Sequence, residues 1–127
     1  MRHEPHQKYN CFPCSVVGTG IAYEYLTGKE FPMTMPKGIN PDGYLPLKDE
    51  DAYIRQFLTV KKKKYFQRKE RITLSEFLNN NKDAVAVCVL GHFIFVDGSD
   101  YWSFFNNECD MVVCAWYLER ENNNESN

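Results

Sequence analysis

The stretch QKYNCFPCSVVGTGIAYEYLTG, residues Gln7 to Gly28, decides the fold of this chain. Small and apolar residues from Ser15 to Leu26 predict a helix. Pro13 suits the first turn of that helix, and Gly28 suits the position just after its end. Two glycines inside it each weaken a helix by about 1 kcal/mol, so we expect close packing to hold this one.

Cys11 precedes this helix by a few residues and is the candidate nucleophile. The first turn of a helix has unpaired backbone N–H groups and the positive end of the helix dipole, which stabilise a thiolate and lower its pKa. Cys14 completes a Cys-x-x-Cys pair, which is also compatible with redox chemistry or zinc binding. We expect Cys14 to pack on the buried side of the helix.

The bulk composition fits one domain over residues 1–120. The chain has 127 residues, of which 43% are hydrophobic, and a net charge of -2 that gives no reason to expect nucleic acid as a partner. No apolar run approaches the roughly 20 residues that cross a bilayer, so no membrane partner is expected. Five cysteines without a signal peptide before them favour reduced thiols in the cytoplasm. Composition does not define the oligomeric state.

Periodicity and turn residues divide the rest of the chain into short elements. The predicted elements are a loop over 29–46, a helix over 47–58, a strand over 59–69, a capped helix opening at 73–76, strands over 84–90, 92–96, 101–105 and 111–118, and a disordered tail over 121–127. This order predicts an α+β fold in which the N-terminal helix packs on an antiparallel β-meander.

Four consecutive lysines, Lys61 to Lys64, lie in the predicted strand over 59–69. Such a run fits an edge strand that lysine protects from aggregation, and it also fits a patch for an acidic partner. We favour the edge strand.

His92 is the histidine that falls inside a predicted core strand. The turn chemistry of Asp97 to Asp100 predicts a hairpin that brings the residues after Phe105 back beside His92. Those residues are Asn106 and Asn107, and a side-chain amide from either one can fix the tautomer of an imidazole. Cysteine, histidine and asparagine in this order are the parts of a thiol nucleophile system.

These residues resemble the papain-like cysteine peptidases, and within them the small C39-type and C39-like peptidases. The likeness rests on Gln7 before Asn10-Cys11-Phe12-Pro13 and on Gly91-His92-Phe93 at the start of a strand. It covers residues 7–28 and 84–118. Three features differ: Gln7 is closer to Cys11 than is usual, the third catalytic position is asparagine where C39 enzymes have aspartate, and Cys14 is extra.

The resemblance implies Cys11 as nucleophile, His92 as base and acid, and Gln7 as oxyanion donor with the Cys11 N–H. It also implies a hydrolase that cleaves a peptide or isopeptide bond through a thioester, with a protein or peptide as substrate and no metal or cofactor. Deamidation and acyl transfer use the same residues and stay open. The alternatives are a non-catalytic papain-like module that binds a protein partner and a Cys-x-x-Cys redox or zinc protein.

Overall fold

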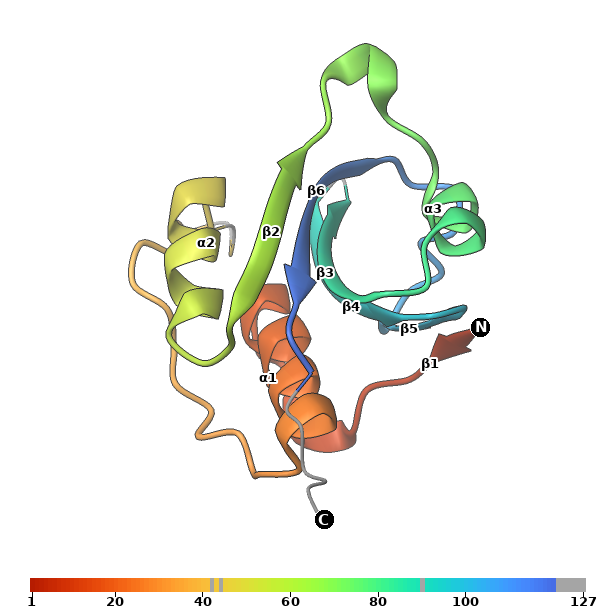
Figure 1. Ribbon diagram of the computed structural model, residues 1–127. Helices are drawn as coiled ribbons and strands as arrows, with labels where there is room; N and C mark the ends of the chain where they lie inside the picture. The colour runs from red at the N-terminus through yellow and green to blue at the C-terminus, as the bar shows by residue number, and fades with distance from the viewer. Residues whose placement is uncertain (42, 44, 90, 121–127) are drawn as a thin grey trace.

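The computed structural model describes residues 1–41, 43, 45–89 and 91–120. The predicted tail over 121–127 lies outside them. The chain is α+β, as predicted, and Figure 1 shows its arrangement. Its helices are α1 (Cys14–Thr27), α2 (Leu47–Arg55) and α3 (Leu74–Asn80), with 3-10 turns η1 (Gln7–Tyr9) and η2 (Arg68–Glu70). Its strands are β1 (Arg2–His3), β2 (Val60–Tyr65), β3 (Ala84–Val89), β4 (His92–Asp97), β5 (Asp100–Trp102) and β6 (Val112–Leu118).

The strands of the described ranges form one sheet in the order β1-β5-β4-β3-β6-β2. β3, β4 and β5 form the predicted antiparallel hairpins. The prediction that β6 continues this meander is wrong, because β6 pairs with the other edge of β3 and with β2. β3 is apolar on both faces and buried along its length. A central position, with partners on both edges, satisfies its backbone hydrogen bonds.

Residues 1–10 show neither helical nor strand periodicity in the sequence, yet Arg2 and His3 form a short strand that pairs in parallel with Tyr101 and Trp102 of β5. The His3 ring stacks on Trp102, with the ring centroids 4.9 Å apart. This pairing ties the segment that precedes the cysteines to the sheet.

The two faces of the sheet carry separate hydrophobic clusters. Side chains of α1 pack with Phe93, Phe95 and Trp116 on one face. Side chains of α3 pack with Ile94 and Val96 on the other face. Figure 1 shows α1 and α3 on opposite sides of strands β3 to β6. The alternation along β4 therefore decides which side chains face α1.

Two glycines let α1 pack closely, as predicted. A Cβ atom at Gly18 would lie 2.6 Å from Cδ2 of Phe93 and 2.8 Å from the Phe93 carbonyl oxygen. A Cβ atom at Gly20 would lie 2.8 Å from Cε1 of Tyr9 and 2.9 Å from Cδ2 of Phe31. Gly28 ends the helix in the left-handed conformation at φ 73°.

The predicted loop over 29–46 has no helix or strand in its described part, and it is packed. Phe31 is buried in a cluster with Val16 of α1 and Tyr53 of α2. The Tyr53 hydroxyl donates a hydrogen bond to the carbonyl oxygen of Thr34. α2 is itself anchored to the sheet by the indole N–H of Trp116, which donates to Asp51 Oδ1 at 2.9 Å.

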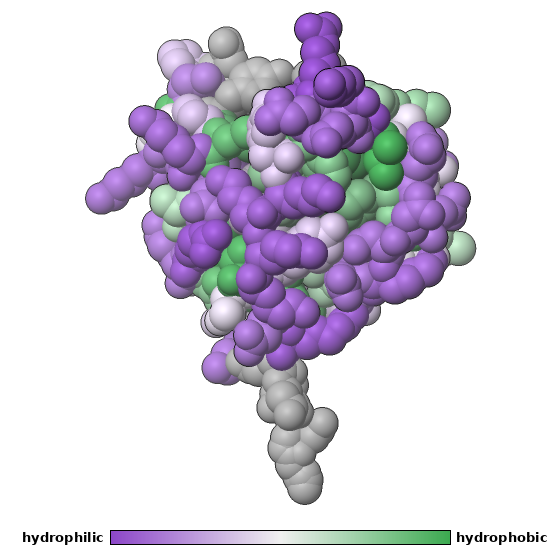
Figure 2. Space-filling view, turned by 45° about the horizontal axis from the view of Figure 1, so that its top comes forward, coloured by the Kyte–Doolittle hydropathy of each residue, from purple (hydrophilic) through white to green (hydrophobic). Residues whose placement is uncertain are grey.

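β2 is the last strand in the sheet order, as expected for a lysine-rich edge strand. Lys61 to Lys64 are exposed, and Lys62 and Lys63 lie over the rings of Tyr117 and Trp116. The face shown in Figure 2 is covered mostly by hydrophilic residues with small hydrophobic areas between them.

The predicted cap at Thr73 is present at the start of α3. The Thr73 hydroxyl accepts a hydrogen bond from the Glu76 N–H at 3.2 Å. The Glu76 carboxylate lies 3.4 Å from the same hydroxyl. The Leu74 N–H donates to the carbonyl oxygen of Asp110, which attaches this helix to the segment before β6.

Candidate active site

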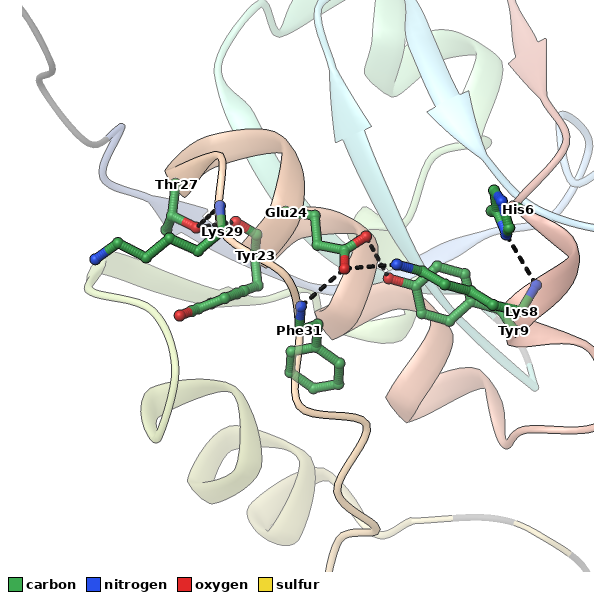
Figure 3. A network of polar contacts seen from close by, with 8 residues as sticks. All are labelled: His6, Lys8, Tyr9, Tyr23, Glu24, Thr27, Lys29 and Phe31. Atoms are coloured by element: carbon green, nitrogen blue, oxygen red, sulfur yellow. Dashed lines mark hydrogen bonds and ion pairs between the residues drawn. The ribbon is translucent and has the colours of Figure 1, made fainter.

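The segment before the cysteines is held by Glu24 of α1, as Figure 3 shows. The Glu24 carboxylate accepts hydrogen bonds from Lys8 Nζ at 2.7 Å, the Tyr9 hydroxyl at 3.1 Å and the Phe31 N–H at 2.8 Å. Because Tyr9 is buried and bonded to α1, the chain from Asn10 onward starts from a fixed point.

Cys11, the predicted nucleophile, lies in the turn between η1 and α1. Its side chain is exposed and its φ angle is 69°, in the left-handed region that is uncommon for cysteine. Gln7, the predicted oxyanion donor, is exposed in η1. Neither Cys11 nor Gln7 lines the cavity between the start of α1 and strands β4 and β5. Their catalytic roles stay predictions.

Cys14, the second cysteine, is the first residue of α1. Burial raises the pKa of its thiol, while the backbone N–H of Phe93 in β4, hydrogen-bonded to the sulfur, lowers it. The nearby Glu50 carboxyl group raises this pKa further, and the N–H groups of Ser15 and Cys14 lower it. Burial is the largest of these effects, so the pKa of the Cys14 thiol lies above its ordinary value.

A cavity of about 300 Å³ lies between the start of α1 and the ends of β4 and β5. Cys14 and His92 both line it. Five of the other residues that line it are aromatic: Phe12, Phe93, Trp102, Phe104 and Phe105. Sequence reasoning predicted His92 as a site residue and favoured a packing role for Cys14.

His92 is half-buried at the start of β4. By the alternation of the strand, its side chain leaves the backbone on the same face as Ile94 and Val96. Its ring lies 5.2 Å from the ring of Phe105, centroid to centroid. Cys14 and His92 line the same cavity, but no hydrogen bond between described residues joins their side chains.

Asn106 and Asn107 are bonded to groups other than His92. Asn106 Oδ1 accepts from the Glu108 N–H at 3.0 Å and from the Tyr101 hydroxyl at 3.3 Å. Buried Asn107 donates from Nδ2 to Asp110 at 2.7 Å, and its Oδ1 accepts from Ser103. β5 ends at Trp102, short of the predicted Phe105, and the chain bends there. The structure therefore does not bring either asparagine into a hydrogen bond with His92.

Glu50 of α2 is a buried acid beside Cys14 that sequence reasoning missed. It is only 4% exposed, and burial raises the pKa of its carboxyl group to about 8. In the sequence, Glu50 stands between Asp49 and Asp51 near the start of the helix, where acidic residues suit the helix dipole. One signal was available: Glu50 lies three and four residues before Tyr53 and Ile54, so it belongs to the apolar face of α2.

No group of three or more His, Cys, Asp and Glu side chains within residues 1–41, 43, 45–89 and 91–120 is arranged to hold a metal ion. All five cysteines are free thiols. None of the helices in these ranges is both long enough and apolar enough to cross a bilayer.

Comparisons of the chain with models of known protein families, with curated proteins and with solved structures find no match.

Proposed function

We propose that this chain is a papain-like, thiol-dependent hydrolase of amide bonds, with Cys14 in place of Cys11 as its nucleophile and His92 as its base and acid. The observation that carries the proposal is the placement of the Cys14 thiol. It lies at the start of α1, near the backbone N–H groups of Ser15 in α1 and Phe93 in β4. Cys14 also lines the same cavity as His92. A thiol, a base and a substrate-sized cavity are the minimum that nucleophilic acyl transfer needs.

The proposed reaction requires the His92 side chain, which leaves β4 on the face opposite α1, to rotate around the start of the strand toward Cys14, where it takes the thiol proton. The sulfur then attacks the substrate carbonyl carbon, and the C–N bond breaks as His92 returns the proton to the leaving amine. Water, activated by His92, hydrolyses the resulting thioester and restores the thiol. Deamidation and transfer to another nucleophile differ only in the leaving group or in the acceptor.

The cavity also supports a peptide or protein as the substrate. Its aromatic wall suits an apolar side chain, and Cys14 and His92 are the titratable residues among those that line it. A peptide with a large apolar residue before the cleaved bond is thus the best first probe.

The test compares the pH dependence of Cys14 alkylation in a Cys11→Ser background, with and without His92→Ala. Because burial raises the Cys14 pKa, unassisted alkylation needs alkaline pH. If His92 acts as base, the rate at pH 7 should fall about 100-fold in His92→Ala, a typical contribution of general base catalysis. His6→Ala is the matched control, because His6 lines a different cavity. Equal rates in the His92→Ala and parent proteins at every pH would reject the Cys14–His92 pair.

A second candidate function is binding of an acidic protein partner without catalysis. It is favoured by the exposed Lys61 to Lys64 on the edge strand β2. A cavity of about 610 Å³ beside β2 is lined by Arg68 and Arg71. This function is favoured if an acidic peptide binds equally tightly to Cys14→Ala and to the parent chain, and if the parent chain shows no acylation at Cys14.

A further inference from the structure

Glu50 is a buried acid with one oxygen that no described residue pairs. Its Oε1 accepts a hydrogen bond from the Ser15 hydroxyl at 3.3 Å, and its Oε2 has no hydrogen-bond partner among the described residues. None of the ion pairs between described residues includes it. A buried polar atom without a partner costs stability, so its presence requires an explanation.

The carboxyl group lines a second, smaller cavity of about 60 Å³. Cys14, Cys88 and His92 line the same cavity. Since a water molecule takes about 30 Å³ in the liquid, this cavity has room for a small polar group such as a carbonyl oxygen. Cys14 and His92 border both cavities, so the aromatic cavity and the acid-lined one adjoin at these residues.

Burial raises the pKa of Glu50 to about 8, so its carboxyl group is mostly protonated at pH 7. The titratable neighbours are Cys14 of α1, Cys88 of β3, His92 of β4 and Tyr53 of α2. Burial raises the pKa of the Cys88 thiol to about 12, so that thiol is neutral too. A neutral carboxyl group is a hydrogen-bond donor, and its unpaired Oε2 can carry the hydrogen.

We propose that Glu50, as a carboxylic acid, donates a hydrogen bond from Oε2 to the carbonyl oxygen of the acyl group that Cys14 attacks. The inference rests on the proposed function and gives Glu50 the role that was predicted for Gln7, which is exposed in η1. When the C–S bond forms, the carbonyl π pair moves to oxygen, and Glu50 stabilises that charge without losing its proton. This electron pair re-forms the carbonyl double bond when the C–N bond breaks and the amine leaves. A neutral acid held in an apolar site is an established type of oxyanion donor.

The test uses a peptide aldehyde, N-acetyl-phenylalaninal, on Cys11→Ser protein. The aldehyde adds to a thiol and places its oxygen where the oxyanion would lie, so its affinity measures oxyanion stabilisation without turnover. Glu50→Gln keeps an N–H donor and should bind within about five-fold of the parent protein at pH 7. Glu50→Leu keeps the size but no donor and should bind about 100-fold more weakly, the typical loss for one oxyanion donor.

The pH dependence separates this role from a structural one. Above about pH 8 the parent protein should lose aldehyde affinity as Glu50 ionises, whereas Glu50→Gln should not. Iodoacetamide alkylation of Cys14, which forms no oxyanion, reports whether each variant keeps its fold and thiol.

Three outcomes overturn the inference, and they are distinguishable. If the parent protein binds the aldehyde and Glu50→Leu binds it equally well, Glu50 is not a donor while the proposed function stands. If the parent forms no adduct at Cys14, the proposed function fails and the inference fails with it. An affinity that rises through pH 8 would show that the ionised carboxylate, and not the carboxylic acid, stabilises the adduct.

Discussion

The thiol of Cys14, in the first turn of α1, lies against the backbone N–H of Phe93 in β4. This contact joins the helix that carries the cysteine to the strand that carries His92. It exists because Gly18, one turn further along α1, lets the helix approach Phe93 closely. The close packing of α1 on β4 is therefore a condition for the site.

Gly18→Ala should destabilise the protein by roughly 1–3 kcal/mol, the usual cost of overpacking a core. The added Cβ would lie 2.8 Å from the Phe93 carbonyl oxygen, a backbone atom that cannot move without the strand. Urea unfolding gives the free energy of unfolding. Gly28→Asn is the control, since no atom lies within 4 Å of that Cβ position and asparagine tolerates its positive φ. Equal stability of Gly18→Ala and the parent would contradict the packing of α1 on Phe93.

Glu50 should make the stability of the protein depend on pH. Its pKa is raised from 4.5 to about 8 in the fold, so the folded state binds more protons than the unfolded state between these values. The free energy of unfolding should then fall with rising pH, by up to about 1.4 kcal/mol per pH unit in this window. Stability from the protonated acid is fully present below pH 4.5 and lost as pH rises through about 8.

The measurement is urea unfolding of the parent, Glu50→Gln and Glu30→Gln at pH 5 and pH 8. Glu50→Gln should gain stability relative to the parent between the two pH values, because its amide does not ionise. Glu30 is exposed and serves as the matched control. A stability difference between Glu50→Gln and the parent that stays constant with pH would mean that Glu50 is ionised throughout.

Asn107→Ala should lower stability by about 1–3 kcal/mol, because it leaves the Asp110 carboxylate and the Ser103 hydroxyl without their partner. Asn106→Ala should cost less, since Asn106 is exposed. Neither variant should change the rate of Cys14 acylation by more than about three-fold. A loss of ten-fold or more in one of them, at unchanged stability, would restore that asparagine as the partner of His92.

Local signals in the sequence were sufficient for most elements. The helix after Pro13, its end at Gly28 and the turn at Asp97 to Asp100 depend on residues within a few positions of each other, and all are present. The position of β6 was not predictable, because pairing on either edge of the β3–β5 hairpins satisfies the same alternation pattern. Strand order depends on contacts between residues far apart in the sequence.

The same dependence on contacts between distant residues explains why the candidate site was predicted only in part. Sequence spacing predicted Cys11 and His92 as site residues, whereas the proposed choice of Cys14 over Cys11 depends on which cysteine enters the helix. Pro13 adopts an extended conformation before the first helical residue, and this leaves Cys11 outside. Glu50 comes from a separate helix, and only the packing of α2 on α1 brings it beside Cys14.

The most direct test of the account is the position of the acyl group after reaction with N-acetyl-phenylalanine p-nitrophenyl ester at pH 7. Peptide mapping by mass spectrometry should find the acyl group on Cys14, in the parent chain and in Cys11→Ser. Cys14→Ser should release p-nitrophenol at least 100-fold more slowly, because removal of the nucleophile abolishes covalent catalysis. Acylation of Cys11 alone, with full activity in Cys14→Ser, would contradict the assignment of Cys14 as the nucleophile.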